Sequence, residues 1–223
     1  MNGKASNNKY NMRQKLSGSL DHQPHFMGVR SVLAILCIVV TASGMTAVVS
    51  AATASTTVSS VISPVISLLT TNGTVNVNVV PTGSGAQTIS SDTVTVSTSD
   101  TNGYTLQLAE TGAGSTLVSG SDTIPASSGT QGTPIAMAVN SWGYRVDGVG
   151  GFGAGTTSSQ SSAAVSGTIK FAAVPATGSP NTIKTTSGTA TNDASTVWYA
   201  VAANTSQPAG TYTNSVTYTA TAN

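Results

Sequence analysis

Apolar side chains alternate with threonine, serine and other polar residues along much of the chain beyond residue 70. A period of two places successive side chains on opposite faces of an extended backbone, so this pattern predicts β-strands rather than helices. The clearest case is DTVTVSTSDTNGYTLQLAE, residues 92–110, where Asn102 and Gly103 stand near the centre and tolerate a positive φ. We predict a β-hairpin over these residues.

Other segments with the same alternation predict further strands at 74–80, 137–146, 168–174, 195–204 and 209–223. The sequence SQPAG, residues 206–210, forms a short connection between the last two of these segments. Because short turns favour pairing between the strands that they join, we predict a second hairpin here. The terminal strand is then expected to close its own module, and donation of this strand to another molecule is the alternative.

Residues 58–69, VSSVISPVISLL, carry apolar side chains at a spacing that would suit one face of a helix. Pro64 lies in the middle of this segment, and it removes a backbone donor and would break such a helix. Two short strands, or one edge strand with a bulge at Pro64, are predicted instead. Glycine, serine and proline predict irregular connections at 111–135 and 147–163.

Seven to nine short strands separated by turn residues predict an all-β fold. We expect an antiparallel β-sandwich, Ig-like or jelly-roll-like, over residues 74–223, with 52–73 as a linker or edge-strand segment. Threonine and valine are branched at Cβ and favour extended backbone, which supports this fold class. A domain of this size can bury a substantial core without disulfides or metal ions.

The front of the chain has the order of an export signal. Five of the eight basic residues lie in the first thirty positions and precede the apolar run 32–49, which predicts one N-terminal hydrophobic helix. VSAATA, residues 49–54, offers the small residues that a signal peptidase accepts. Residues 1–51 are therefore predicted to be a cytoplasmic leader with a signal peptide or an uncleaved transmembrane anchor. Both alternatives place the rest of the chain outside the cytoplasm, with membrane contact through 32–49 only.

The composition of residues 52–223 excludes one class of partner. Serine and threonine make up 60 of these 172 residues, and three basic residues stand against six acidic ones, which gives a net charge of −3. Binding of nucleic acid requires a dense basic surface that neutralises phosphates. We therefore expect no nucleic-acid partner.

The residue types of residues 52–223 also argue against catalysis. His22, His25 and Cys37 all precede residue 52, so no histidine-activated nucleophile and no His/Cys zinc site can form in this part. The carboxylates are dispersed, and Asp100 beside Asn102 suits a turn better than a calcium loop. We predict that the protein is not an enzyme, with no catalytic residue, metal site or cofactor.

Aromatic residues are few, so each is a candidate for recognition. Trp142 and Tyr144 lie at the start of a predicted strand that leads into the glycine-rich loop containing Phe152. Loops on a rigid scaffold commonly carry binding residues. We therefore predict a contact site at Trp142, Tyr144 and Phe152, and place the remaining tyrosines of 199–218 in the core.

The segments TNGYTLQL and PAGTYTNSVTYTATAN, with NSWGYRVDG between them, carry a resemblance to a group of known proteins. They resemble secreted, cell-surface β-sandwich proteins of Gram-positive-type and candidate-phylum bacteria, including WxL-like wall-binding modules and pilus-subunit-like modules. The chain has Trp142-Gly143-Tyr144 where a WxL module has Trp, any residue and Leu.

This resemblance implies a noncatalytic protein that acts by binding or assembly, in adhesion or as an envelope coat. The implied partners are a cell-envelope or host-surface protein, a glycan, or a second copy of the chain. Two alternatives stay open: a subunit of a surface fibre assembled by strand donation, and a carbohydrate-binding module. Glycan binding that depends on Trp142 would distinguish the second alternative from the first.

Overall fold

Antiparallel strands dominate the computed structural model, which describes residues 51–112 and 114–223 and confirms the all-β class. The compact unit that we describe is Val58–Asn223. Its strands are β1 (Ile66–Thr70), β2 (Ala86–Thr98), β3 (Tyr104–Glu110), β4 (Leu117–Ser119), β5 (Asp122–Ile124), β6 (Ile135–Ala136), β7 (Ser141–Arg145), β8 (Gln160–Ala164), β9 (Lys170–Phe171), β10 (Asn181–Thr185), β11 (Ala190–Ala203) and β12 (Val216–Ala222). One 3₁₀ turn, η1, covers Gly150–Phe152.

The predicted N-terminal hydrophobic helix at 32–49 lies outside the described residues. Among the residues that the structure does describe, no helix has the length and apolar character needed to cross a bilayer.

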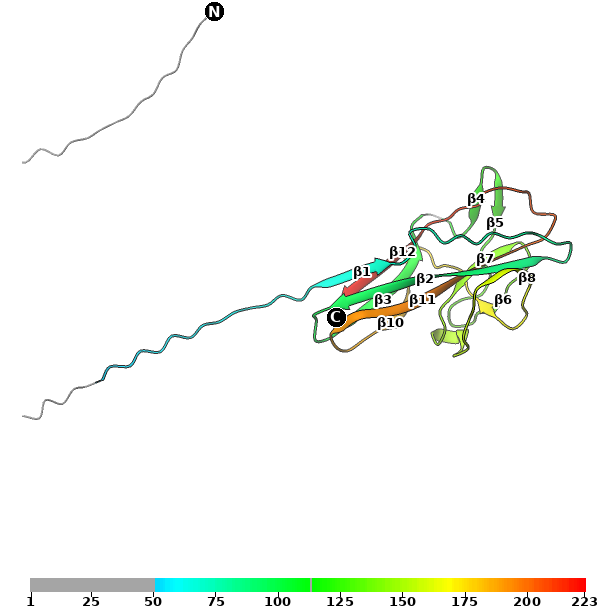
Figure 1. Cartoon of the computed structure of the whole chain (residues 1–223). Coiled ribbons are helices and arrows are strands. Elements are labelled where there is room, and N and C mark those ends of the chain that lie inside the picture. The colour runs from blue at the N-terminus through cyan, green and yellow to red at the C-terminus, as the bar shows by residue number, and fades with distance from the viewer. Residues whose placement is uncertain (1–50, 113) are drawn as a thin grey trace, which may run out of the picture. The chain divides into compact units, whose positions relative to one another are not determined.

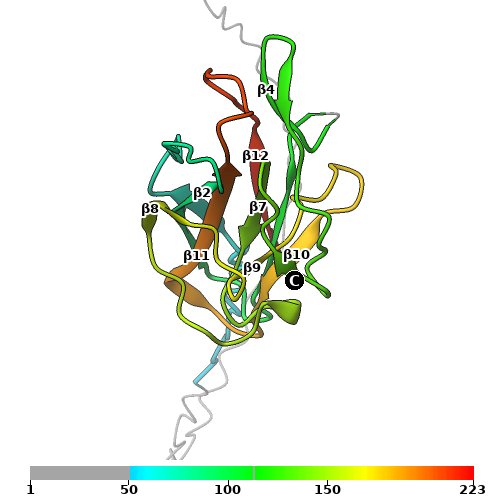
Figure 2. The ribbon, with the colours of Figure 1, turned by 90° about the vertical axis from the view of Figure 1, so that its right-hand side faces the viewer.

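Two sheets contain most of the strands (Figure 1). The first has the order β1-β2-β11-β7, and β8 pairs with β2 beyond the end of β1. The second has the order β10-β3-β12. Figures 1 and 2 show the long strands β2 and β11, which pair along most of their length in the first sheet. Two short pairs, β4 with β5 and β6 with β9, complete the set in the described residues.

The two main sheets share one hydrophobic core. Val94 and Val96 of β2 are fully buried against side chains of the second sheet, including Leu106 and Leu108 of β3. These residues are the alternate positions that the sequence pattern marked, because a pleated strand directs every second side chain to one face. A smaller apolar cluster contains Ile89, Met137, Phe171, Ala200 and Ala202.

Polar contacts also join the two sheets through their side chains. The hydroxyl groups of Tyr199 in β11 and Tyr218 in β12 lie 2.7 Å apart. The hydroxyl of Tyr104 in β3 donates to Oδ2 of Asp193 in β11 at 2.8 Å, and Lys184 of β10 pairs with the other oxygen of this carboxylate. The tyrosines therefore contribute both apolar area and a satisfied polar end to the interior.

The predicted hairpin over 92–110 is wrong in its pairing. Both strands exist, but β2 belongs to the first sheet and β3 to the second, so the turn between them crosses from sheet to sheet. The backbone N–H of Asn102 donates to Oδ1 of Asp100 at 2.8 Å, and Gly103 has a φ of 87°. A Cβ on Gly103 would lie 2.2 Å from the carbonyl oxygen of Thr186. These turn residues indicate a chain reversal, but they do not determine which strands pair.

The second predicted hairpin is wrong for the same reason. β11 pairs with β2 and β7, whereas β12 pairs with β3 along all seven of its residues. The terminal strand thus completes the second sheet of its own module, as expected, but through a partner distant in sequence.

Three other predicted strands are shortened or absent. Only Ser141–Arg145 and Lys170–Phe171 are strands within 137–146 and 168–174. Residues 74–80 keep the expected alternation of half-buried valines, yet they form no strand. The hydroxyls of Thr88 and Ser90 in β2 donate to the carbonyls of Asn78 and Asn76 at 2.7 and 2.9 Å. Side-chain hydroxyls thus bond to this backbone where a β-ladder was expected.

The expected irregular connections contain some strand: β8 begins at Gln160 inside 147–163, and one short hairpin lies inside 111–135. β4 and β5 pair within 111–135 through Leu117 and Ile124 at one end and Ser119 and Asp122 at the other. In the segment 58–69, a single edge strand, β1, begins after Pro64 and pairs with the second half of β2.

Candidate functional site

The structure places the three predicted contact residues in the interior. Trp142, Tyr144 and Phe152 are 4%, 0% and 5% exposed, and all three belong to the shared core. The indole Nε1 of Trp142 donates to the carbonyl of Ser115 at 2.7 Å, and the Tyr144 hydroxyl donates to Oε1 of Gln131 at 2.7 Å. The Tyr144 and Phe152 rings meet edge to face at 5.5 Å. None of these rings presents a face on which a sugar could stack.

A buried arginine explains why the glycine-rich loop is closed over these rings. Nε of Arg145 donates to Oδ1 of Asp147 at 2.5 Å and to Oγ1 of Thr157 at 2.7 Å. The guanidinium carbon lies 5.8 Å from the centre of the Phe152 ring, within the range of a cation–π contact. Burial acts to raise the pKa of Asp147, but hydrogen bonds from Thr157 and Arg145 outweigh it and hold the pKa below its ordinary value. Residues 147–157 are thus fastened to the end of β7.

Two features of the structure have no such internal partner, and the first is the edge of β12. Within the described residues, β12 pairs with β3 alone; β1 of the first sheet lies close to β12 but forms no β-ladder with it. Edge strands usually carry charge, proline or bulges that prevent further pairing. β12 has the sequence VTYTATA, which contains none of these residues.

The opposite edge of the same sheet is protected in the usual way. β10 carries Lys184, and its register with β3 shifts between Thr182 and Lys184. The side-chain amide of Gln131 donates to the carbonyl of Thr182 at 2.9 Å. One edge of the second sheet is therefore blocked, whereas the other, at β12, has no paired strand, and we call it the open edge.

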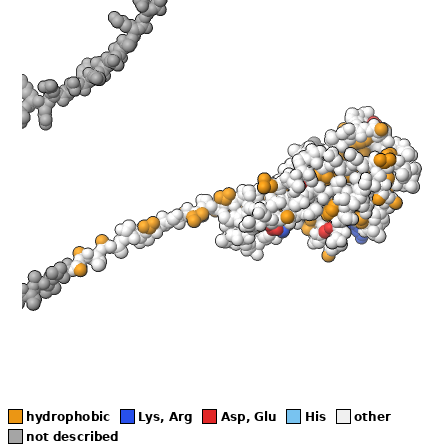
Figure 3. All heavy atoms as spheres, in the orientation of Figure 1, with side chains coloured by type: hydrophobic (Ala, Val, Ile, Leu, Met, Phe, Trp, Pro, Cys, Tyr) orange, Lys and Arg blue, Asp and Glu red, His pale blue; other side chains and the backbone are white. Residues whose placement is uncertain are grey.

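The N-terminal segment 58–65 is the counterpart of this open edge. Val58, Val61 and Ile62 are 89–90% exposed and Val65 is 68% exposed, and the segment has no secondary structure. Figure 3 shows hydrophobic side chains spaced along this extended part of the chain. Isolated exposed apolar residues are common on protein surfaces, whereas here four of eight successive residues are exposed and apolar.

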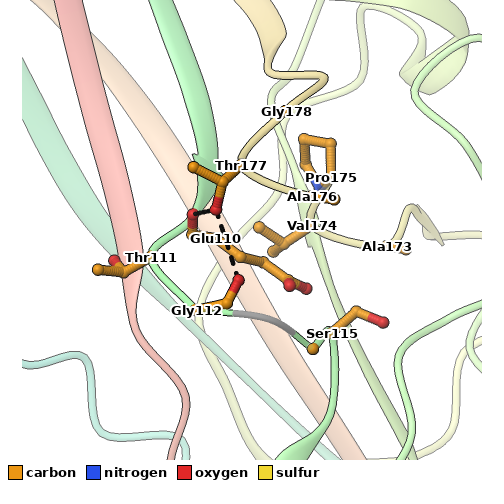
Figure 4. Close-up of a pocket in the computed structure, with 11 residues that line it drawn as sticks. Glu110, Thr111, Gly112, Ser115, Ala173, Val174, Pro175, Ala176, Thr177 and Gly178 are labelled. Carbon is orange, nitrogen blue, oxygen red and sulfur yellow. Dashed lines mark hydrogen bonds between the residues drawn. The ribbon is translucent and has the colours of Figure 1, made fainter.

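The second feature without an internal partner is a buried carboxylate. Glu110, the last residue of β3, is 2% exposed, and its Oε1 has no hydrogen-bond partner among the described residues. It lines an open cavity of about 860 Å³ between residues 110–112 and 114–115 on one side and the segment 173–178 on the other (Figure 4). Burial alone raises the pKa of Glu110 above its ordinary value. Glu110 is the only Glu beyond residue 51, yet the sequence pattern gave no sign of its position, because it ends a regular strand.

No metal centre is formed by the described residues, since no group of three or more His, Cys, Asp or Glu side chains is placed to hold an ion there. Comparison with known proteins gives no match to a family model, to a curated protein or to a solved structure.

Proposed function

We propose that this chain is a noncatalytic, exported β-sandwich protein of the cell surface that assembles with copies of itself by strand donation. In this proposal the segment 58–65 of one copy adds as a strand to the open edge of β12 in the next copy. The apolar run 32–49 behind a basic leader supports export. The two antiparallel sheets with one shared core support the sandwich assignment.

The exposed apolar segment 58–65 carries this proposal. Complete burial of one valine or isoleucine side chain stabilises a complex by about 1.5–3 kcal/mol. Ile66 of β1 pairs with Thr98, the last residue of β2. Val65 still bonds to Ser99 through its backbone N–H and carbonyl, so it is residues 58–64 that run beyond the end of this sheet neighbour. A second copy of the chain can therefore supply a partner for these side chains more readily than β2 of the same copy can.

The pleat of β1 indicates which face of the donor strand would be apolar. Ile66 and Leu68 are half-buried against the core, and extension of the same alternation puts Val58 and Ile62 on their face. Val61 then lies on the opposite, outer face. Pro64 lacks a backbone donor, which is tolerated in a strand at the edge of a sheet.

The acceptor edge matches this donor in length and in chemistry. β12 presents seven residues of backbone, close to the eight residues of 58–65. Its half-buried side chains, Val216, Tyr218 and Ala220, pack against the core and alternate with exposed threonines. Main-chain hydrogen bonds would supply affinity, and the apolar alternate positions would set the register.

Cysteine cross-linking between two preparations of the full chain tests this arrangement. Both carry Cys37→Ser; one adds Val61→Cys with a size tag, and the other adds Thr217→Cys, Thr219→Cys or Thr221→Cys on the outer face of β12. We expect a disulfide-linked heterodimer that is strongest at one of the three β12 positions, because neighbouring strands bring same-face Cβ atoms within about 5.5 Å. The additional change Ile62→Asp is expected to abolish this product.

Thr182→Cys is the matched control, because it is exposed on β10, the blocked edge of the same sheet. Heterodimers that form equally well at β10 and β12, or at neither edge, would rule out assembly through β12. In that case the segment 58–65 would act as a stalk or would bind a different protein.

A further inference from the structure

Glu110 is an unusual residue for a fold with so few charges. Its carboxylate is almost fully buried, yet no Lys or Arg pairs with it, and one of its oxygens has no hydrogen bond within the described residues. A buried charge without a partner is costly, and proteins retain such groups mainly where a ligand or a reaction uses them. The cavity beside Glu110 gives such a ligand access.

We propose that this cavity binds a primary ammonium group carried on an alkyl chain, such as a lysine side chain, with the Glu110 carboxylate as its counter-ion. This site stands on different residues from the assembly edge and is independent of strand donation. The assignment follows from the chemistry of the cavity walls, from the fixed position of Glu110 and from the exclusion of other ligand classes.

The walls of the cavity suit a cation with an apolar stem. Val174 and Pro175 contribute apolar surface, and Ser115 and Thr177 contribute neutral hydroxyl groups. The hydroxyl of Thr111 bonds instead to that of Thr217 at 2.7 Å. Figure 4 shows the Glu110 carboxylate extending between Val174 and Ser115. An ammonium group has three donors and no acceptor, which complements a carboxylate and nearby hydroxyl oxygens. Its alkyl stem would lie along the apolar wall.

The backbone around Glu110 is held in place before any ligand arrives. The N–H of Glu110 donates to the carbonyl of Pro175 at 2.9 Å. The hydroxyl of Thr177 donates to the carbonyl of Glu110 at 2.6 Å. These two bonds fix the end of β3 against the segment 173–178, so a ligand would not have to order it.

Other ligand classes fit this cavity less well. A calcium ion requires six to eight oxygen ligands, usually with several carboxylates, and Glu110 is the only carboxylate in the lining. A sugar is usually bound with an aromatic face, and no aromatic residue lines the cavity. Anions are excluded by the charge of Glu110 itself.

No other charged side chain in the cavity lining complicates the ionisation of Glu110. Glu110 is the only acidic or basic residue in the lining. The adjacent β12 contributes Tyr218, whose hydroxyl bonds to Tyr199, and the adjacent β10 contributes Lys184, which pairs with Asp193. Binding of an ammonium ion requires ionised Glu110, so acidification should release the ligand.

The experiment is a titration of the isotope-labelled full chain with n-butylammonium chloride, followed by amide NMR shifts. We expect saturable shifts confined to residues near Thr111, Ser115 and Thr177. The isosteric variant Glu110→Gln should lose these shifts, and the control Asp122→Asn, which removes an exposed carboxylate, should keep them. The ammonium ion stays charged from pH 4 to pH 7, so binding about tenfold or more weaker at pH 4 would report the ionisation of Glu110.

Two further titrations distinguish the source of the ammonium group. A blocked Ala-Lys-Ala peptide that binds more tightly than n-butylammonium, while its norleucine analogue does not bind, identifies a protein lysine as the ligand. Equal binding of amine and peptide identifies a small amine. Shifts that persist in Glu110→Gln, or no saturable shift with any of these probes at pH 7, would overturn the proposal and would leave strand donation untouched.

Discussion

Two glycine-rich loops of this protein each lie beside a buried charged residue, but they differ in how closely they pack against it. The loop 147–157 follows Arg145, which is 5% exposed and donates to Asp147 and Thr157. The second loop, described at residues 111–112 and 114–115, follows Glu110, which is 2% exposed and has an oxygen without a partner in the described part of the chain. The first loop is closed over its charge, and the second borders a cavity.

Some glycines of the two loops differ in the space around them. A Cβ on Gly151 would lie 2.4 Å from the carbonyl oxygen of Gly132, and one on Gly150 would lie 2.4 Å from that of Gln131. A Cβ on Gly112 would meet no atom within 4 Å. Close packing thus requires glycine at positions 150 and 151 of the first loop, whereas Gly148 and Gly153 of that loop and Gly112 of the second lie in open space. Glycine content therefore predicts a loop but not whether the loop is packed or open.

Replacement of Arg145 should have the largest effect, because it removes the charge that fastens the closed loop. In Arg145→Met the carboxylate of Asp147 keeps only its bonds from Thr157 and loses its cationic partner. We expect a loss of about 3 kcal/mol in the free energy of unfolding, the low end for a broken buried ion pair. Urea unfolding of the full chain, followed by the combined fluorescence of Trp142 and Trp198, measures this loss.

Lys170→Met is the matched control, since this exposed side chain is also basic and lies near the same loop. Arg145 contacts Lys170 only through its backbone carbonyl, which the substitution retains. We expect a change within about 0.5 kcal/mol, as for ordinary surface substitutions. A similar loss in both variants would show that net charge, rather than the fastening of the loop, determines stability.

The glycine comparison gives the next largest effect. Gly151→Ala must displace the carbonyl of Gly132 or Cδ of Pro134, so we expect a loss of about 2 kcal/mol, typical of overpacking. Gly112→Ala adds a methyl group in open space and should change stability by less than about 0.5 kcal/mol. Thermal unfolding of both variants measures the difference. Equal stability of the two variants would contradict the distinction between a packed loop and an open loop.

The sequence pattern predicted the strands much better than their partners. The alternation of β2, β3, β11 and β12 reports which side chains face the core, and those residues are buried or half-buried as expected. Turn residues between β2 and β3 report only that the chain reverses. Whether the reversal stays within a sheet depends on the long-range pairs β2 with β11 and β3 with β12, which local sequence does not encode.

The candidate site was less accessible to prediction from sequence. A strand followed by a glycine-rich loop suggested exposure of Trp142, Tyr144 and Phe152, but Arg145 and Asp147 hold that loop over them. The sequence did not predict the position of Glu110, because burial of its carboxylate depends on a segment more than sixty residues away, 173–178. The exposed apolar residues of 58–65 were visible in the sequence as an edge segment. The sequence did not show that these side chains lack a partner, because this depends on where β2 ends.

Removal of the Glu110 charge should have the smallest effect of the three and the opposite sign. Because burial raises the pKa of Glu110 above that of the unfolded chain, the folded state binds this proton more tightly. The carboxyl is neutral in both states below its ordinary pKa, and the cost of its burial appears as the pH rises through the raised pKa. Glu110→Gln should therefore be more stable than the wild type at pH 7, by roughly 1 kcal/mol, and equal to it at pH 4. Urea unfolding at both pH values measures this crossover, with Asp122→Asn as the exposed control. A Glu110→Gln variant that is destabilised at pH 7 would mean that the carboxylate already has a partner. The loop after Glu110 would then not differ from the loop after Arg145 in this respect.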